Sequence, residues 1–321
     1  MSAPMPRFAV IRPAGLEEAL QALRRSPAPR PLAGGTDLIT NLRHGLVAAE
    51  TLLDLSRIET LRGITRTGTG WRIGAGVRLC EIVECADLAG FAALLQAARS
   101  VAGPAHREAA TLGGNLCQDT RCLHYNQSDW WRRANGYCLK YRGETCHVAP
   151  RGNRCRAAYC GDLAPALMVL GAEAEIVSGA GSRRIPLTEM FREDGAAWLR
   201  LGPGELLAAI HLPAPPPRDS AYEKIRLRGA MEFPLAGVAV ALSGSGTQRR
   251  IRLALTGTNS CPLTVELPPL PAPGADAAPW LAALEKRVQS AASPQRTTTV
   301  APHYRRLSAA ALAARLAGRM I

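Results

Sequence analysis

The sequence has few aromatic residues, far fewer acidic than basic residues, and no long hydrophobic run. Phe, Trp and Tyr make up 5% of the 321 residues, and no apolar stretch reaches the roughly 18 residues that cross a bilayer. We therefore expect no membrane association. The net charge of +13 invites a nucleic-acid partner. The scarcity of aromatics and the lack of any helix-turn-helix, finger or RNA-recognition signature argue against one.

Several catalytic signatures are also missing. The chain has no G-x-G-x-x-G fingerprint, no P-loop, no zincin motif and no Ser-His-Asp order, and its six histidines are scattered. These absences argue against a Rossmann dinucleotide site, a P-loop nucleotidase and the common hydrolases. The first residues lack the basic region and apolar run of an export signal, so we expect a cytoplasmic protein, in which disulfides are rare.

Cysteine, by contrast, is concentrated in one segment. Six of the nine cysteines lie between Thr111 and Pro165, at positions 117, 122, 138, 146, 155 and 160. Such crowding indicates disulfides, a structural zinc or an iron-sulfur cluster. No pair has the compact C-x2-C spacing frequent in zinc sites. Thiolates dispersed around a loop favour a four-iron cluster, while a zinc clip and unliganded thiols remain alternatives.

Two Gly-Gly pairs precede the crowded cysteines in the sequence, at Gly34-Gly35 and Gly113-Gly114. Paired glycines allow backbone conformations closed to other residues and can turn consecutive N–H groups toward a phosphate. Either pair alone is a common turn. Together with the D-x-x-P segment that begins at Asp162, however, they form a recognisable set.

This set resembles the FAD-binding segments of the molybdenum hydroxylase family, which includes xanthine dehydrogenase and CO dehydrogenase. The resemblance covers almost the whole chain and implies bound FAD, held non-covalently. It implies that two segments wrap the FAD pyrophosphate, with Asp162 near the ribityl or ring portion and Lys224 near the flavin ring. The first segment is Leu32, Ala33, Gly34, Gly35, Thr36 and Asp37, and the second is Thr111, Leu112, Gly113, Gly114 and Asn115. A flavin subunit that relays electrons needs no catalytic acid or base of its own.

The spacing departs from the family pattern in one place. Asn115 and Asp162 are 47 positions apart, where the family has about a dozen, so residues 119–159 are an insertion. This insertion resembles the one in the 4-hydroxybenzoyl-CoA reductase branch of the family, which carries an extra 4Fe-4S cluster. Within the resemblance, Cys117 and Cys160 belong to the shared frame. The implied cluster ligands are Cys122, Cys138, Cys146 and Cys155.

The resemblance further implies an oxidoreductase assembly. The chain would be the FAD subunit of a heterotrimer with a large molybdopterin subunit and a small 2Fe-2S subunit, paired as a dimer of heterotrimers. The reaction implied is reductive dehydroxylation of a phenolic acyl-CoA in anaerobic aromatic degradation. Electrons would pass from ferredoxin to the 4Fe-4S cluster and FAD, and then towards the 2Fe-2S clusters and molybdenum. A flavin subunit with a zinc clip, or a basic Cys-liganded interaction protein, are the alternatives.

Charge in the insertion favours an acidic partner. Between residues 121 and 156, eight Arg or Lys against two acidic residues leave +6. We expect an exposed docking surface that includes Arg132 and Arg133 and the aromatics of the loop. Those aromatics are Tyr125, Trp130, Trp131, Tyr137 and Tyr141.

Periodicity completes the expectation of an α+β fold. We expect helices near 16–23, 88–101, 164–170, 280–291 and 304–317, and strands near 52–55, 71–77, 174–177, 206–212, 237–242 and 251–256. The run Pro213 to Pro217 marks a boundary. The resemblance implies a two-part FAD-binding domain of the vanillyl-alcohol-oxidase/PCMH type over 1–216. A smaller α/β C-terminal domain of the CO dehydrogenase flavoprotein type would follow over 217–321.

Overall fold

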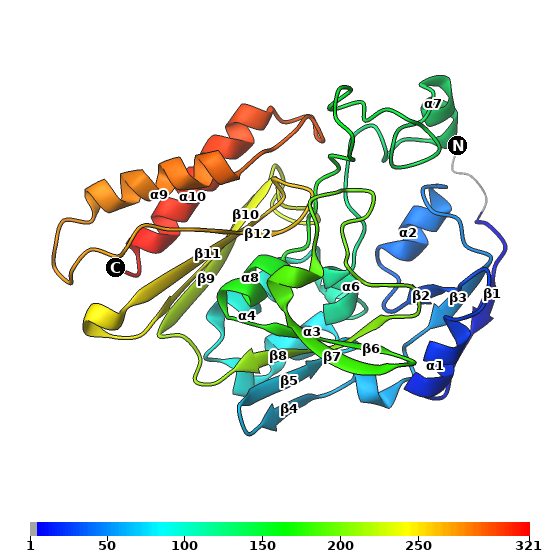
Figure 1. Ribbon diagram of the computed structural model, residues 1–321, viewed down its shortest axis with the longest axis horizontal. Helices are drawn as coiled ribbons and strands as arrows, with labels where there is room; N and C mark the ends of the chain where they lie inside the picture. The colour runs from blue at the N-terminus through cyan, green and yellow to red at the C-terminus, as the bar shows by residue number, and fades with distance from the viewer. Residues whose placement is uncertain (1–4) are drawn as a thin grey trace.

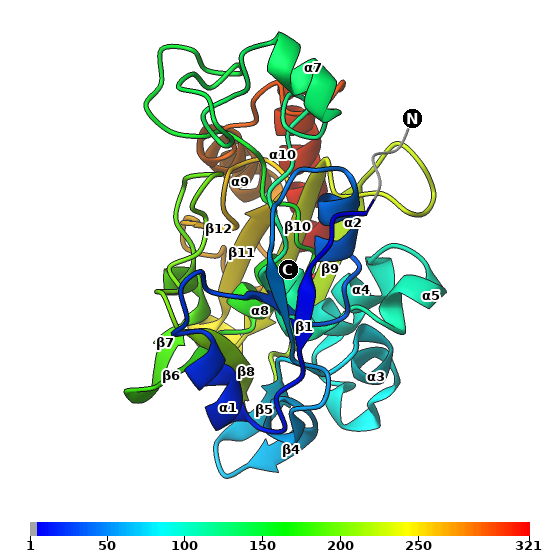
Figure 2. The ribbon, with the colours of Figure 1, turned by 90° about the vertical axis from the view of Figure 1, so that its right-hand side faces the viewer.

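Three separate β-sheets organise the chain, each built from a different stretch of sequence. We describe residues 5–321 of a computed structural model. A three-stranded parallel sheet, a five-stranded antiparallel sheet and a four-stranded antiparallel sheet follow one another, with helices packed between and outside them (Figures 1 and 2). The mixture confirms the expected α+β class. No helix within residues 5–321 is long and apolar enough to cross a membrane.

The first sheet has the order β1-β3-β2 and is parallel throughout. Its strands are β1 (Ala9–Ile11), β2 (Arg30–Leu32) and β3 (Thr51–Asp54), with α1 (Leu16–Ala22) and α2 (Leu38–Arg43) as crossover helices. Parallel strands need such crossovers, and the first Gly-Gly turn lies between the end of β2 and the start of α2. Leu52 and Leu53 are fully buried, as their unbroken apolar run predicts.

The second sheet has the order β4-β5-β8-β6-β7. Its strands are β4 (Ile64–Thr67), β5 (Gly70–Gly74), β6 (Glu173–Ser178), β7 (Gly181–Pro186) and β8 (Leu206–Pro213). The chain between β5 and β6 forms α3 (Leu79–Glu84), α4 (Ala92–Ser100), α5 (Pro104–Arg107), α6 (Leu112–Leu116) and α8 (Leu163–Val169). Short 3-10 turns lie at Glu59–Leu61, Ala86–Leu88, Leu187–Met190 and Gly246–Gln248. The second Gly-Gly pair lies inside α6.

The third sheet, β12-β11-β10-β9, is sandwiched between two helical layers. Its strands are β9 (Asp219–Ile225), β10 (Ala236–Ser243), β11 (Arg250–Thr256) and β12 (Leu263–Val265), and α9 (Ala278–Ala291) and α10 (Pro302–Gly318) cover one face. Val238 and Val240 pack with these helices, whereas Ala239 and Ala241 belong to the core shared with α4 and α8. Because side chains alternate along a strand, β10 buries both faces. The proline run lies in the connection between β8 and β9, and the packing continues across it.

The insertion forms an irregular lobe at one end of the molecule. Figures 1 and 2 show it above the three sheets, near α2 and the far ends of α9 and α10. Its one helix within the described chain is α7 (Asp129–Ala134), where Ser128 caps the N-terminus by accepting a hydrogen bond from the Trp131 N–H. Arg132 is 2% exposed and donates to the Gly45 carbonyl, which ties α7 to the loop after α2.

Candidate functional site

A cavity of about 740 Å³ lies between the first and second sheets, a volume typical of cofactor sites. Both Gly-Gly turns line it, and the insertion closes part of its wall. The lining includes Ala33, Gly34, Gly35, Thr36, Asp37, Thr111, Gly113, Gly114, Gln118, Asp119, Tyr125, Lys140, Tyr141 and Trp198. The structure therefore brings together most of the two predicted segments.

The first turn offers free backbone donors. The N–H groups of residues 33–37 donate no hydrogen bond to any residue of 5–321, although the turn borders the cavity. Gly34 packs so closely that a Cβ there would lie 1.8 Å from the Ala109 carbonyl oxygen, and Gly35 has φ +72°. Only glycine permits both features without strain. Unpaired N–H groups facing a cavity suit a phosphate or another anion.

The second turn contributes differently. The N–H of Gly113 donates to the Ala75 carbonyl over 2.8 Å, and the N–H of Gly114 to Thr111 Oγ1 over 3.1 Å. The N–H groups of Leu112 and Asn115 are also bonded, to the carbonyls of Val77 and Thr111. These donors are already used, so the second turn supplies a wall without side chains rather than a ring of donors. A bulky cofactor can approach its backbone closely.

Two buried donors in the cavity lining have no partner. Gln118 Nε2 and Trp198 Nε1 are each inaccessible to solvent and make no hydrogen bond within the described chain. A buried polar group without a partner costs free energy, so such groups usually have a ligand or water to bond. FAD, with its phosphates, ribityl hydroxyls and ring carbonyls, offers acceptors to both. In the sequence alone, nothing marks Gln118 or Trp198 as part of a binding site.

Asp37 connects the first turn to the insertion. Its carboxylate accepts from the Asp119 N–H over 2.9 Å and from Asn41 Nδ2 over 3.2 Å, and it forms an ion pair with the Arg121 guanidinium. Burial raises the pKa of Asp37 above its usual range, and Arg121 offsets part of that rise. Arg121 also donates to Asn41 Oδ1 over 3.1 Å. The first glycine turn and the start of the insertion thus share one buried polar network.

Five predicted residues lie outside the cavity lining, namely Leu32, Leu112, Asn115, Asp162 and Lys224. Leu112 is fully buried in the main core. Asn115 Oδ1 accepts from the Leu163 N–H over 3.1 Å and so orders the start of α8. Asp162 and Lys224 form a buried ion pair with each other. The structure pairs these last two in the packed interior, outside the cavity lining.

The cavity and fold have counterparts among known proteins. Residues 6–215 match the family described as FAD binding domain in molybdopterin dehydrogenase. The chain belongs to this family. The flavin subunit is 29% identical over 259 residues to the aldehyde oxidoreductase FAD-binding subunit PaoB of Escherichia coli (strain K12), covering 78% of this chain and 80% of that protein.

Two further relatives support the assignment. The flavin subunit is 29% identical over 259 residues to the carbon monoxide dehydrogenase medium chain of Afipia carboxidovorans, covering 79% and 76% of the two chains. A solved structure of reconstituted CO dehydrogenase from Oligotropha carboxidovorans superposes with TM-score 0.76 at 25% identity, over 98% of this chain and 97% of that one. The expected fold of this flavoprotein type is therefore confirmed, and the chain is an FAD-binding oxidoreductase subunit of the molybdenum hydroxylase type.

The four insertion cysteines of the flavin subunit are buried near one another, at a place that we call the cysteine pocket. Cys122, Cys138 and Cys155 belong to one buried cluster, and Cys146 acts electrostatically on Cys122 and Cys155. Cys122, Cys138, Cys146 and Cys155 are each at most 9% exposed. Burial raises the pKa of Cys122, and the nearby Cys138 and Cys146 raise it further. Burial likewise raises the pKa of Cys155 to about 12, with added repulsion from Cys146 and Cys122. These effects place Cys138 and Cys146 within electrostatic reach of Cys122, and Cys122 and Cys146 within electrostatic reach of Cys155.

Cys117 and Cys160 stand apart from that pocket. Burial alone raises the pKa of Cys117 to about 12. Burial raises the pKa of Cys160 to about 11, and the charges that act on it belong to Arg305, Arg121, Asp162 and Lys224. None of the four insertion cysteines acts on the pKa of either thiol.

No group of three His, Cys, Asp or Glu in residues 5–321 converges closely enough to hold a single metal ion. A four-iron cluster has a different requirement, because each thiolate binds a different iron at a different corner. Cys155 Sγ already accepts a hydrogen bond from the Ala157 N–H over 3.4 Å, and the N–H groups of His124 and Tyr125 point at Cys122. Buried thiols with backbone donors fit cluster ligation, since hydrogen bonds to sulfur are a usual feature of such sites.

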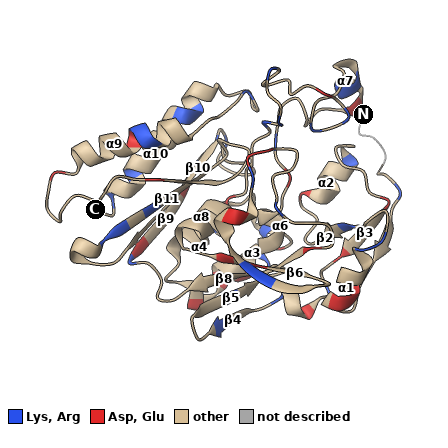
Figure 3. Cartoon of the chain, viewed as in Figure 1, with Lys and Arg blue, Asp and Glu red and all other residues tan. Residues whose placement is uncertain are grey.

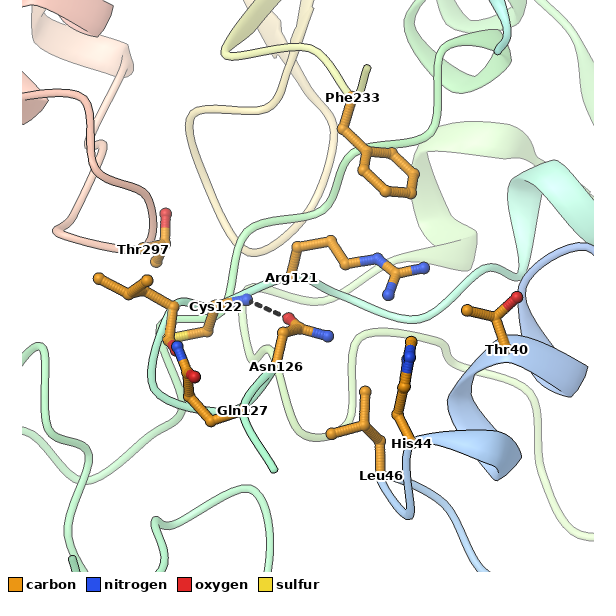
Figure 4. Close-up of a pocket in the computed structure, with 10 residues that line it drawn as sticks. Thr40, His44, Leu46, Arg121, Cys122, Asn126, Gln127, Phe233 and Thr297 are labelled. Carbon is orange, nitrogen blue, oxygen red and sulfur yellow. Dashed lines mark hydrogen bonds between the residues drawn. The ribbon is translucent and has the colours of Figure 1, made fainter. Parts of the chain in front are cut away.

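Figure 4 shows the start of the insertion at a second cavity, of about 390 Å³. This cavity is lined by Thr40 of α2, by His44 and Leu46 after it, by residues 121–123, 126 and 127, and by Phe233 and Thr297. The Cys122 N–H donates to Asn126 Oδ1 over 2.9 Å, while Arg121 stacks its guanidinium 4.6 Å from the Phe233 ring centroid. Adjacent residues therefore serve different sites, with Arg121 directed to Asp37 and Cys122 to the cysteine pocket.

The expected docking surface needs correction. Arg132 is buried, and so is Tyr125, at 3% exposure, because both pack inside the lobe. Trp131, Tyr137 and Tyr141 are half-buried, and only Trp130, at 77%, is fully exposed among the five aromatics. Arg133 and Arg151 are exposed, and Figure 3 shows basic residues on the lobe around α7. The surface is smaller than the sequence suggested.

Proposed function

We propose that this chain is the flavin and iron-sulfur electron-transfer subunit of a molybdenum enzyme of the 4-hydroxybenzoyl-CoA reductase type. The gathering of Cys122, Cys138, Cys146 and Cys155 in one buried pocket supports the proposal most directly. Neither Cys117 nor Cys160 shares that pocket, so the grouping is selective. Flavin binding alone does not call for four buried thiols in the insertion.

The residues fit a 4Fe-4S cluster in chemistry as well as in number. Without the cluster the thiols would be neutral, because burial raises the pKa of Cys122 and Cys155. Cluster iron would displace their protons, as metals do when they bind thiols. When bound, the cluster would supply one-electron transfer. The chain's part is to keep the four sulfurs dry, oriented and hydrogen-bonded.

The flavin cavity supports FAD as the second cofactor. The free N–H groups of residues 33–37 would hold the pyrophosphate, with Gly113 and Gly114 allowing close approach from the other side. Gln118 and Trp198 would donate to other FAD oxygens. By resemblance, Leu32, Leu112 and Asn115 would shape the two segments. Asp162 and Lys224, which the resemblance puts near the ribityl chain and the ring, would support the site from the packed interior as a buried ion pair.

The wider assembly is part of the same proposal. Relatives named as medium chains indicate larger and smaller partner chains. We infer a large molybdopterin subunit and a small 2Fe-2S subunit, in a dimer of heterotrimers, with ferredoxin as the electron donor and a cytoplasmic location. The substrate would be a phenolic acyl-CoA bound by the large subunit, so this chain would touch neither substrate nor molybdenum.

We also propose a division of the chain near Pro217. Residues 1–216 would form the FAD-binding domain, with the cluster-binding insertion at 119–159, and residues 217–321 the smaller C-terminal domain. The family match ends at residue 215, and the proline run separates β8 from β9. The two parts nevertheless share the core between α4, α8 and the third sheet, so we expect them to unfold together.

The deciding experiment is iron, zinc and flavin analysis of the co-purified complex, with serine variants of single cysteines. We expect a flavin band with a broad iron-sulfur shoulder, and loss of the shoulder in Cys138→Ser. Cys160→Ser is the matched control, because it is equally buried but lies outside the pocket, and it should keep its iron. Zinc in place of iron would establish the structural-clip alternative. Iron that survives Cys138→Ser would overturn the ligand assignment.

A further inference from the structure

Lys140 occupies an unusual place between the two proposed cofactor sites. It belongs to the insertion, two residues after Cys138, yet it lines the 740 Å³ flavin cavity. Its side chain is only 5% exposed. A lysine so deeply buried is uncommon and requires partners for its charge.

The partners of Lys140 lead directly to the flavin turn. Nζ lies 2.7 Å from Asp119 Oδ1, donates to the Thr120 carbonyl over 3.0 Å, and also contacts Thr120 Oγ1. The backbone N–H of Asp119 in turn donates to Asp37 Oδ2. Lys140 thus pairs with Asp119, and Arg121 pairs with Asp37. The Asp119 N–H joins the two ion pairs and, together with Arg121, connects the insertion to the first glycine turn.

The ammonium also lies close to the cysteine pocket. Nζ is 4.4 Å from the ring centroid of Tyr125 and 5.2 Å from that of Trp198. Tyr125 packs with Cys122, Cys138 and Cys155 in one buried cluster. Lys140 therefore lies between the flavin cavity and the buried cluster that contains three of the four insertion cysteines.

We propose that Lys140 is a positioning residue that links the cysteine-rich insertion to the flavin-binding turn through Asp119, and that its charge sets the potential of the cluster. The inference rests on the proposed function and adds a coupling between its two cofactors. Removing the ammonium frees Asp119 and loosens the turn that holds FAD. It also removes a positive charge that stabilises the more negative, reduced cluster.

The test compares Lys140→Met with Arg142→Met in the holoenzyme. Arg142 lies in the same loop and carries the same charge, but it is exposed and stacks only on Tyr137 and Tyr141. We expect the FAD dissociation constant of Lys140→Met to rise roughly tenfold or more, the effect of losing one charged hydrogen bond. The cluster midpoint potential, followed by electron paramagnetic resonance during redox titration, should shift downward. Arg142→Met should match the wild type in both.

A second variant keeps the proposal testable if Lys140→Met fails to fold. Lys140→Met combined with Asp119→Asn removes both buried charges and leaves no unpaired carboxylate, so it should fold where the single variant does not. FAD affinity in this variant should still be reduced, because the link from Lys140 to the turn is gone. Wild-type FAD affinity in either Lys140 variant would overturn the link. An unchanged potential in Lys140→Met would overturn the electrostatic part.

Metal analysis of the wild type separates this inference from the proposed function. A protein with FAD but without iron would refute the cluster assignment, and with it the predicted shift in potential. The FAD measurements on the Lys140 variants would still decide whether the insertion holds the flavin turn.

Discussion

Lys224 Nζ lies 2.9 Å from Asp162 Oδ1, and the two side chains are 2% and 4% exposed. The pair joins β9 of the third sheet to the start of α8, which packs between the second and third sheets. Tyr222 adds a hydrogen bond of 2.7 Å to the same carboxylate oxygen. The contact therefore connects the two proposed domains through charge as well as through apolar packing.

Replacing Lys224 by Met should be strongly destabilising. The change leaves the Asp162 carboxylate buried without its counter-charge, at a cost of about 3–5 kcal/mol in the free energy of unfolding. Urea denaturation measures it, and Lys224→Met with Asp162→Asn should recover much of the loss. Arg228→Met is the control, because the Arg228 side chain of the Arg228–Glu232 pair is 70% exposed and should contribute less than about 1 kcal/mol. Equal effects at the two sites would contradict the assignment.

The second glycine turn can be tested at Gly114. A Cβ there meets only Thr111 Oγ1 at 3.0 Å and Ala33 Cβ at 4.0 Å, and the backbone has no left-handed φ. We expect Gly114→Val to fold and yet to purify with much less FAD, since the isopropyl group enters the cavity. Gly68→Val, at a turn with nothing within 4 Å of its Cβ, should retain flavin.

Flavin content per polypeptide, measured after acid precipitation, reports the result for Gly114→Val. Because we expect non-covalent FAD, the flavin should stay in the supernatant. Yellow colour in the pellet would indicate a covalent link. Full flavin content in a folded Gly114→Val protein would show that this turn does not face the cofactor.

The regular elements were predictable because their patterns are strong. The apolar runs at 206–212, 237–242 and 251–256 became β8, β10 and β11 within a residue or so at each end. The helices predicted at 280–291 and 304–317 became α9 and α10. The helix predicted at 88–101 was too long, because Gly90 and Phe91 separate a 3-10 turn from α4. The strand predicted at 71–77 ends at Gly74, where the chain turns into the cavity wall.

The site was predictable only where motif and geometry coincide. The first glycine turn is recognisable in the sequence from Gly34 and Gly35, because its backbone conformation and packing require glycine at both positions. Gln118, Lys140 and Trp198 carry no such signal, because their role depends on segments that meet only in the fold. The prediction that Arg132 is exposed was wrong for the same reason. A charge in a polar loop is normally solvated, and only the packing of α7 against the loop after α2 buries this one.

Acid should weaken the second sheet through Glu175. Burial alone raises the pKa of this carboxyl, but hydrogen bonds from Arg72 and His211 outweigh it and hold the pKa below the usual 4.5. The contacts measure 3.2 Å and 2.6 Å and join β6 to β5 and β8. A lowered folded pKa means that the stabilisation is present above the unfolded pKa and is lost as pH falls through the folded pKa.

We therefore expect the wild-type free energy of unfolding to decline below about pH 5 more steeply than that of Glu175→Gln. At neutral pH the variant should be the less stable of the two, and the gap should narrow as the acid protonates Glu175 in the wild type. Denaturant titrations at several pH values measure both curves. Parallel curves would show that Glu175 contributes nothing to acid sensitivity.

The exposed arginines of the lobe should govern encounter with an acidic ferredoxin. Arg133 and Arg151 are exposed, whereas the buried Arg132 is excluded from this role. Long-range attraction between opposite charges raises association rates, so Arg133→Glu with Arg151→Glu should slow reduction by reduced ferredoxin about tenfold at low salt. The difference should shrink as salt rises, because the screening length falls to about 3 Å at 1 M. Arg66→Glu is the matched control, since β4 lies at the opposite end of the molecule (Figures 1 and 2).

Stopped-flow measurements of the reduction rate at several ionic strengths test this prediction. A rate indifferent to salt, or equal in the lobe and β4 variants, would show that the lobe packs against a neighbouring subunit instead of receiving the donor.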